Sequence, residues 1–252
     1  MWKLDSDGTP PLWRHLDDPH LARIAFTTRL GGVSPPPYDS LNLGRSTADD
    51  ASFVAANRTR VLAALDLSID RLATAGQIHG AVVTRVNSPG LHPDCDALVT
   101  THPGLALAVS GADCLPILFT THRGVAVAHA GWRGVAAHIP RRALEALCDA
   151  TGLSAGDVHV HFGPANRPCC YEVGPEVAAH FPAPCVTHRG ESLRLDVPGA
   201  ARLQLEAVGV DPAAIQDVGE CTSCSNGRYF SHRRDRGVTG RQWGVVAMAT
   251  RA

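Results

Sequence analysis

Four short apolar runs follow one another between residues 96 and 130, and they constrain the fold more than any other feature of the chain. The runs are DALVTT (96–101), LALAVSG (105–111), LPILFTT (115–121) and GVAVAHA (124–130), with Gly, Pro or a polar turn between them. Runs of this length are typical of strands buried on both faces. None approaches the ~18 uninterrupted apolar residues of a membrane span. We therefore expect a buried sheet and no association with a membrane.

Helical and strand patterns alternate on both sides of these runs. A helix is expected after Asp50 in DASFVAANRTRVLAALDL, because its apolar residues recur at helical spacing and Asp49 or Asp50 can cap its start. The same spacing predicts helices in AAHIPRRALEALCDATG, ended by Gly152, and in VPGAARLQLEAVGV, with Pro198 in its first turn. Strands are expected around 77–86, which is rich in β-branched residues, and in the alternating DVHVHFGP.

Interleaved strands and helices over the whole length favour layered α/β or α+β architecture. With 252 residues, 44% of them hydrophobic, the chain can bury a sizeable core without disulfides. We expect one domain over residues 1–252. The segment TTRLGGVSPPPYDSLNLG (27–44) is rich in turn-forming residues and is expected to be an irregular loop of that domain.

Charge composition excludes several classes of function. The formal net charge of −1 provides no field to gather nucleic acid or an anionic membrane, so local arginines must hold any acidic substrate. Lys3 is the only lysine, which leaves 22 of the 23 basic residues as arginine. Schiff-base chemistry, a Walker-type phosphate loop and a lysine general base all need a lysine at the site, and a lysine this close to the terminus is poorly placed for them.

Eight cysteines and 13 histidines are many for a chain of this length. The start, MWKLDSDGTPPLW, lacks the apolar run of a signal peptide, so a cytoplasmic location is expected. Thiols stay reduced there, and metal ligation, catalysis or packing become better explanations for the cysteines than disulfides.

Three polar sites stand at the ends of apolar runs: QIHG (77–80), SGADC (110–114) and HAGWRG (129–134). Each has one N or S metal ligand, His79, Cys114 or His129, beside glycine or alanine, whose small size lets several backbones approach one ion. The spacings of 35 and 15 residues match no zinc finger or ribbon, and a histidine at a strand end is often only a core residue. The residues alone leave both interpretations open.

Eight blocks in a fixed order decide between them: TTRLGGVS, SLNLG, QIHG, DALVT, ADCLPILF, VAVAHAGWRG, GPANRPCCYEVG and YFSHRRDRGVTGRQ. Over residues 26–242 the chain thereby resembles the laccase-domain or multicopper polyphenol oxidoreductase family, described as zinc-dependent purine nucleoside phosphorylases. The resemblance implies a single-domain layered α/β/β/α sandwich with mixed sheets. It also implies a catalytic zinc on His79, Cys114 and His129, and three protein ligands leave the fourth position open, as in catalytic zinc sites.

The activity implied by the resemblance is phosphorolysis of adenosine, inosine, guanosine and methylthioadenosine with inorganic phosphate, accompanied by adenosine deaminase activity. Arg133, next to an expected helix, is our candidate for binding phosphate. Arg29, Asn42 and Gln77 are further candidates for substrate binding, and Asp113 is the candidate for proton handling beside the metal. No nucleic acid and no obligate protein partner is expected.

Two alternative functions stay open. The older family label implies a copper-dependent polyphenol oxidase, and copper is the alternative to zinc at the same ligands. Multicopper oxidases use repeated His-x-His pairs, whereas this chain has one, His159 and His161, which we expect to be solvated or hydrogen-bonded. The second alternative follows from bacterial relatives labelled peptidoglycan editing factors, which implies a role in cell-wall precursor fidelity.

The remaining cysteine pairs are expected to pack rather than to bind metal. Cys221 and Cys224 form a CxxC without the second pair that a zinc ribbon needs, and the adjacent Cys169 and Cys170 are poor chelators of one ion. In SHRRDRGVTGR, arginines 233, 234 and 236 suggest a hydrated turn, although one of them could reach the substrate, and His232 stands where relatives often carry an aromatic.

Overall fold

The computed structural model of the chain describes residues 1–15, 17–20, 22–225 and 227–249. Within this part the strands form three sheets. In spatial order, the seven-stranded sheet contains β1 (Trp2–Asp5), β2 (Leu12–His15), β3 (Arg23–Thr27), β16 (Gln242–Ala247), β8 (Ala106–Gly111), β4 (Leu72–Ala75) and β6 (Gly90–His92). The six-stranded sheet contains β15 (Ile215–Asp217), β11 (His159–Phe162), β9 (Leu115–Thr120), β10 (Val125–Ala130), β7 (Ala97–Thr100) and β5 (Val83–Arg85). The small sheet contains β12 (Glu172–Val173), β14 (Ser192–Leu195) and β13 (Val186–Arg189).

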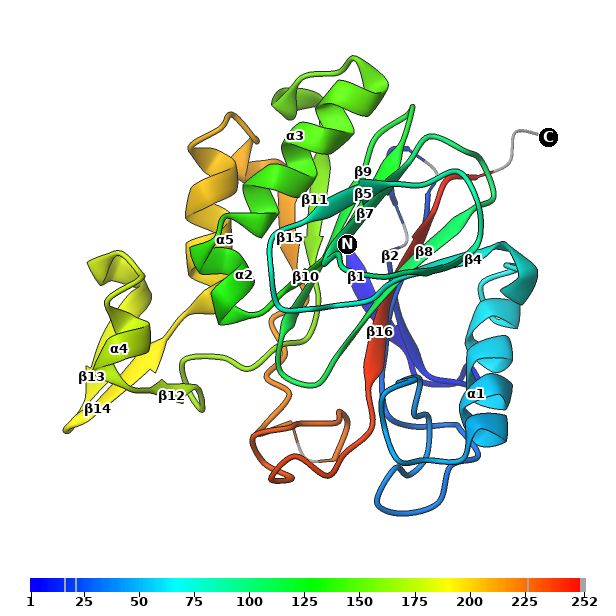
Figure 1. The fold of residues 1–252 in the computed structure, drawn as a ribbon, viewed down its shortest axis with the longest axis horizontal. Helices are drawn as coiled ribbons and strands as arrows, with labels where there is room; N and C mark the ends of the chain where they lie inside the picture. Colours follow the sequence, from blue (N-terminus) through cyan, green and yellow to red (C-terminus); the bar gives the residue numbers. More distant parts are fainter. Residues whose placement is uncertain (16, 21, 226, 250–252) are drawn as a thin grey trace.

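Helices cover the outer faces of the two large sheets. The α-helices are α1 (Ala51–Ala63), α2 (Trp132–Ala136), α3 (Ile139–Thr151), α4 (Pro175–Ala178) and α5 (Val197–Glu206), and the 3-10 turns are η1 (Ile69–Arg71), η2 (Ala155–Asp157), η3 (Ala183–Cys185) and η4 (Pro212–Ala214). Figure 1 shows α3 and α5 on one side of the molecule, α1 on the opposite side, and the small sheet with α4 projecting from one end. Both large sheets mix parallel and antiparallel pairs. The expected α/β/β/α sandwich with mixed sheets is confirmed; that residues 1–252 form one domain stays a prediction.

Alternation along β10 shows how one strand serves two cores. Ala126 and Ala128 pack in the core beneath α3 and α5, whereas Val125 and Val127 pack in the core between the two large sheets. Successive strand residues point to opposite faces, so a strand buried on both faces reads as an unbroken apolar run. His129, near the end of β10, continues the series that faces the space between the sheets.

The predicted helices and strands are largely confirmed, with their end signals. The Asp50 carboxylate accepts the N–H of Ser52 at the start of α1, and Gly152 ends α3 with a positive φ of 69°. The helix containing Pro198 is α5, and the four apolar runs are β7, β8, β9 and β10.

The prediction of a continuous strand around 77–86 was wrong. Only β5 (Val83–Arg85) lies in this range, and residues 76–82 form a loop from β4 in the seven-stranded sheet to β5 in the six-stranded sheet. Gln77 and His79 have positive φ values of 62° and 60°, which no strand allows. Because residues 76–82 pass from one sheet to the other, they cannot form a strand in spite of their β-branched residues.

Residues 28–44 form the expected irregular loop, which lies against α1. The buried Asn57 of α1 accepts the N–H of Val33 and donates to the Ser34 hydroxyl and the Asn42 carbonyl. Asn57 thereby substitutes for the strand partners that the loop lacks.

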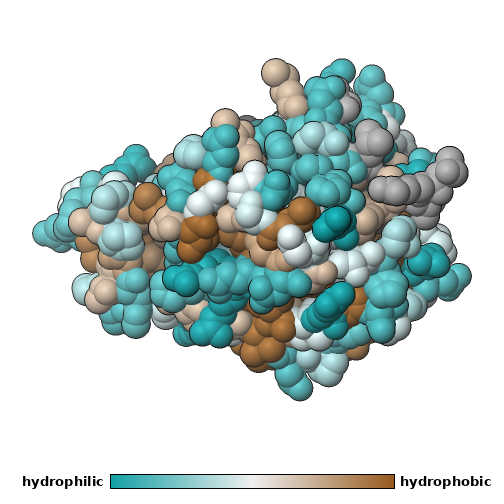
Figure 2. Space-filling model, turned by 90° about the horizontal axis from the view of Figure 1, so that it is seen from above, coloured by the Kyte–Doolittle hydropathy of each residue, from teal (hydrophilic) through white to brown (hydrophobic). Residues whose placement is uncertain are grey.

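The face in Figure 2 is largely hydrophilic, with its hydrophobic residues in separate groups. None of the helices in the described ranges has both the length and the apolarity to cross a bilayer, α1 and α3 having only 13 residues each.

Candidate metal centre

His79, Cys114 and His129 converge at the end of the two large sheets. Their candidate ligand atoms all lie within 4.8 Å of one another, and the two imidazole centroids are 4.8 Å apart at an interplanar angle of 73°. His79 lies in the loop from β4 to β5, Cys114 in the connection from β8 to β9, and His129 in β10. Three chain segments that leave or join the sheets therefore deliver three N and S donors to one point.

Gly131 makes room for this convergence. A Cβ atom at this position would lie 3.0 Å from Cys114 Sγ and 3.3 Å from His79 Nδ1. Both distances are shorter than van der Waals contact, so any side chain would push the ligands apart. A glycine at position 131, two residues after His129, is therefore a geometric requirement of the site.

Asp96 orients the ligands from behind, and the sequence analysis missed it. Its buried carboxylate accepts Nδ1–H of His129 at 2.9 Å and the backbone N–H groups of His79 at 3.0 Å and Gly80 at 2.7 Å. This arrangement leaves Nε2 of His129 for a metal, as in the carboxylate–histidine–metal triads of known sites. The available signal was an acidic residue opening the apolar run DALVTT, where a buried strand begins.

Cys114 and His129 perturb each other strongly. Burial alone would raise the pKa of Cys114, but the charge and hydrogen bond of His129, helped by His79, lower this pKa to about 6. Burial would lower the pKa of His129, but the Cys114 thiolate and the Asp96 carboxylate raise it to about 9. The thiolate, which is the metal-binding form of cysteine, is thereby favoured near neutral pH.

The three ligands open onto a pocket of about 480 Å³, a size typical of small-molecule sites. Four of its lining residues are arginines: Arg45, Arg58, Arg233 and Arg241. Asp113 is the only acidic side chain among the described lining residues. The pocket therefore combines a metal-ligand set with a surplus of positive charge, which suits an anionic ligand.

Gln77 and Asp113, both predicted site residues, line this pocket and are held rigidly. The Gln77 amide accepts from the Ser110 N–H and hydroxyl and donates to the Ser110 carbonyl. Asp113 accepts from the Thr222 hydroxyl at 2.6 Å and from the Arg233 N–H at 2.7 Å. Asp113 has a φ of 95°, and Gln77 also has a positive φ, a feature that clusters at functional sites.

The other predicted substrate-binding residues lie outside the pocket lining. Arg29 pairs with Asp39 at 2.9 Å. Arg133 is exposed, with its guanidinium over the Trp132 ring at 4.4 Å, and it lies within the short α2. Asn42 is fully buried, and its side-chain oxygen accepts the backbone N–H of Arg241. Asn42 thus positions a pocket residue rather than facing the pocket itself.

His159 and His161 belong to β11 and to neither group of possible metal ligands in the described ranges. His161 is fully buried, 3.9 Å from Asp18, and neither of its ring nitrogens has a hydrogen-bond partner among the described residues. The expectation that it is solvated or hydrogen-bonded was wrong, because it packs in an aromatic contact with Trp2 instead. Burial and the neighbouring histidines lower the pKa of His161 well below its usual value.

Fold and site together define a class: a two-sheet α/β/β/α protein with a candidate three-ligand metal centre in a cationic pocket. The chain belongs to the family described as multi-copper polyphenol oxidoreductase laccase, whose family model matches residues 23–249. The resemblance noted in the sequence is thereby confirmed.

Similar proteins cover nearly the whole chain. It is 40% identical over 233 residues to the purine nucleoside phosphorylase of Deinococcus radiodurans, covering 90% of this chain and 89% of that protein. The crystal structure of YlmD from Geobacillus stearothermophilus is similar with a TM-score of 0.90 and 34% identity, covering 95% of this chain and 96% of that one. The structure of the Bacillus licheniformis hypothetical protein YfiH gives a TM-score of 0.91 at 29% identity, covering 98% of each chain.

Proposed function

We propose that this chain is a zinc-dependent purine nucleoside phosphorylase, acting on adenosine, inosine, guanosine and methylthioadenosine with inorganic phosphate. The observation that carries the proposal is the position of the His79, Cys114 and His129 donors in the same pocket as four arginines. The name of the Deinococcus radiodurans relative supports it. A cytoplasmic location belongs to the proposal, because a reducing compartment keeps the Cys114 thiol available.

The residues present fit zinc. Imidazole nitrogen and thiolate sulfur are both zinc donors, and three protein ligands would leave one position for substrate or water. Gly131 provides the close approach that a shared ion requires, and Asp96 supplies the outer carboxylate. Copper prefers similar ligands and stays the alternative metal. When bound, the ion would supply a Lewis acid at the pocket wall.

Phosphorolysis breaks the bond between ribose C1′ and the purine nitrogen and forms a bond from C1′ to a phosphate oxygen. The phosphate must be held beside C1′, and the forked guanidinium groups of Arg45 and Arg241 are our candidates for holding it. Arg233 lines the same pocket, and its backbone N–H fixes Asp113. Asp113 accepts hydrogen bonds on both carboxylate oxygens, and it stays our candidate for proton handling beside the metal.

Adenosine deamination is a second candidate reaction. The three donors of His79, Cys114 and His129 beside the pocket favour it, because a zinc ion held by them would supply the water-activating chemistry that deamination needs. Both reactions start from adenosine, and the products separate them.

The test is to incubate the purified protein with adenosine, with and without phosphate and with and without a chelator. We expect adenine and ribose 1-phosphate, both dependent on phosphate and on metal, while inosine would report deamination. Parallel assays with a phenolic substrate and with cell-wall precursors test the two alternative functions. Undiminished turnover after metal removal, or in a folded His129→Ala variant, would refute the proposal.

The assignment of phosphate to particular arginines has its own test. We expect Arg241→Ala to raise the KM for phosphate, and Arg142→Ala, at an exposed position of α3, to leave it unchanged. Arg133→Ala belongs in the same series. A raised KM for phosphate in Arg133→Ala, with a normal value in Arg241→Ala, would instead assign phosphate binding to Arg133, as the sequence analysis suggested.

A further inference from the structure

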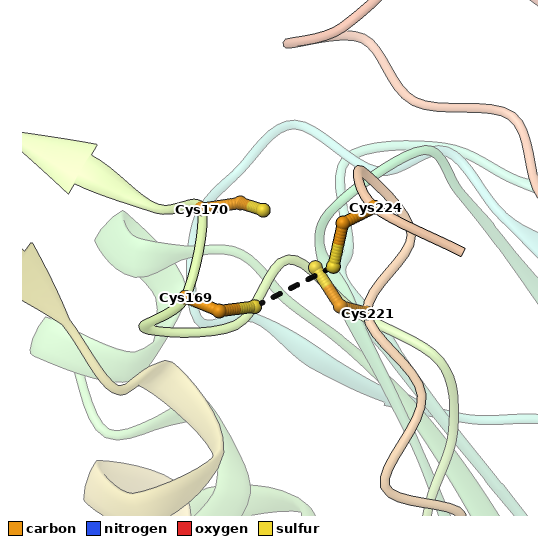
Figure 3. Close-up of side chains that lie close together, drawn as sticks. All are labelled: Cys169, Cys170, Cys221 and Cys224. Carbon is orange, nitrogen blue, oxygen red and sulfur yellow. Dashed lines mark hydrogen bonds between the residues drawn. The ribbon is translucent and has the colours of Figure 1, made fainter. Parts of the chain in front are cut away.

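A second cluster of possible metal ligands lies outside the pocket lining. Cys169 and Cys170 from one loop and Cys221 and Cys224 from another have all four Sγ atoms within 4.8 Å of one another. Figure 3 shows the four side chains projecting into the same space from the two loops. The Sγ atoms of Cys169 and Cys224 are 3.7 Å apart.

This spacing matches tetrahedral zinc. With Zn–S bonds of about 2.3 Å, the sulfur atoms of a tetrahedral site built from four thiolates lie about 3.8 Å apart. A disulfide would bring two sulfurs to about 2.05 Å, and all four cysteines are free thiols. The observed separations therefore require only small side-chain rotations to surround one ion.

A packing role does not account for the cluster. Cys95 and Cys185 are packed in hydrophobic cores, as expected of structural cysteines, whereas the four clustered cysteines belong to none of the described core clusters. Cys169 and Cys224 are exposed. Cys170 is half-buried, and Cys221 is the only one of the four that is buried. Apolar burial therefore stabilises only one of these thiols strongly, and the convergence of all four needs another explanation.

We propose that Cys169, Cys170, Cys221 and Cys224 bind a second divalent cation, zinc by preference, at a structural site separate from the His79–Cys114–His129 centre. The sequence predicted that these cysteines pack, because each pair alone is a poor chelator. The fold brings the two pairs together, and four thiols are a complete ligand set. Four protein ligands leave no open position, which is the arrangement of a structural zinc.

The backbone holds the two loops in place for such an ion. Ala165 donates its N–H to the Glu220 carbonyl and accepts the N–H of Thr222, which forms a bridge between Ala165, shortly before the first cysteine pair, and Cys221 of the second pair. The Arg167 guanidinium pairs with Asp217 at 2.7 Å. Within one loop the Cys170 N–H bonds to the Arg167 carbonyl, which makes the turn that carries the adjacent thiols.

The same loops hold Asp113 of the pocket. The Asn166 N–H donates to the Asp113 carbonyl at 2.8 Å, and the Thr222 hydroxyl donates to the Asp113 carboxylate at 2.6 Å. Asn166 lies three residues before Cys169, and Thr222 directly follows Cys221. An ion joining the cysteine pairs would therefore fix the pocket wall without touching the substrate.

The metal content of protein purified with zinc and a thiol reductant tests the proposal. We expect two zinc atoms per wild-type chain, one in Cys169→Ser/Cys224→Ser, and one in Cys114→Ser/His129→Ala. Zinc-edge X-ray absorption of the last variant should show sulfur ligands alone, at about 2.3 Å. Cys148→Ser, which removes a thiol on α3 outside both clusters, should keep two zinc atoms.

A zinc content that is the same in Cys169→Ser/Cys224→Ser as in the wild-type protein would overturn the proposal. So would a folded Cys114→Ser/His129→Ala variant without zinc, or with nitrogen ligands to the ion that it retains. A mass lower by two hydrogens per bond under non-reducing conditions would show disulfides in place of a metal site and would equally overturn it. None of these measurements uses turnover, so a failure of the proposed phosphorylase activity would leave this test intact.

Discussion

Replacing Asp96 by asparagine tests how much the outer carboxylate contributes to metal binding. Asp96 accepts three N–H groups with its two oxygens, two on Oδ1 and that of Gly80 on Oδ2. Asparagine has one acceptor oxygen, so in Asp96→Asn the amide NH2 must face at least one of these donors. The variant also loses the negative charge that holds the His129 ring.

Losing one hydrogen bond to a charged group costs about 1.5–3 kcal/mol. Changes to outer partners of metal ligands reduce metal affinity by about 10–100-fold, which corresponds to about 1.4–2.8 kcal/mol. Because the two estimates agree, we expect the Kd for zinc to rise by about 10–100-fold in Asp96→Asn.

The assay is a zinc titration of metal-free protein in competition with a chromophoric chelator at fixed pH, with circular dichroism to establish that each variant is folded. Asp94→Asn is the matched control, because it makes the same change of charge two residues away at an exposed position whose φ of 58° suits asparagine. A folded Asp96→Asn protein that binds zinc as tightly as Asp94→Asn would refute the reasoning.

Three further predictions concern affinity, stability and pH. Gly131→Ala should weaken zinc binding, because its Cβ would lie 3.0 Å from Cys114 Sγ. Gly156→Ala, where the nearest atom is 3.8 Å away, is the control in the same chelator titration. Equal Kd values for zinc in the two variants would contradict the prediction. Asn42→Ala should lower the free energy of unfolding in urea by about 1–3 kcal/mol, because the N–H groups of Gly44 and Arg241 lose their acceptor. An unchanged urea midpoint would argue against a positioning role for Asn42. The pKa of His161 is lowered in the folded chain, so the unfolded chain takes up the proton first as the pH falls below about 6.5. The free energy of unfolding should therefore decline by up to about 1.4 kcal/mol per pH unit because of that proton. Urea unfolding at several pH values between neutral and mildly acidic should therefore show a smaller decline in His161→Leu, and equal slopes would contradict the assignment.

The strands at the centre of the fold were readable from the sequence because their residues are buried on both faces. In β10 every residue from Val125 to Ala130 is buried, so the run is apolar apart from His129. The order of the strands within each sheet could not be predicted from the sequence. β16 (Gln242–Ala247) pairs with both β3 and β8, and no local pattern indicates which strands the C-terminal segment will separate.

The same limit applies to the pocket. Arg45 and Arg241 meet only because β16 brings the C-terminal segment beside the loop after β3, and Asn42 then accepts the Arg241 N–H. Arg133 was the more visible candidate in the sequence because it stands beside His129. Proximity along the chain does not place Arg133 among the pocket lining, since its guanidinium lies over the Trp132 ring in the short α2, and its role in phosphate binding stays a prediction.

Buried polar partners and paired thiols were the least visible features. Asp96 shows no periodicity of its own, and its role depends on the ring of His129 and the amides of the 77–80 loop reaching it. The two cysteine pairs lie some 50 residues apart, and each alone is an incomplete chelator. The Ala165 bridge and the Arg167–Asp217 ion pair bring them together, and no sequence pattern in either loop indicates these contacts.

Two aspartates divide the support of the site between different parts of the fold. Asp96, at the start of β7, holds the metal ligands from within the sheets, whereas Asp113 is held from outside by the loops that carry the four cysteines. Disturbing the cysteine cluster should therefore reach the substrate through Asp113 but leave the Asp96 bonds in place. We accordingly expect Cys169→Ser/Cys224→Ser to lower kcat/KM for the nucleoside while the zinc on His79, Cys114 and His129 stays bound, and loss of that zinc in the same variant would show that the two supports are not independent.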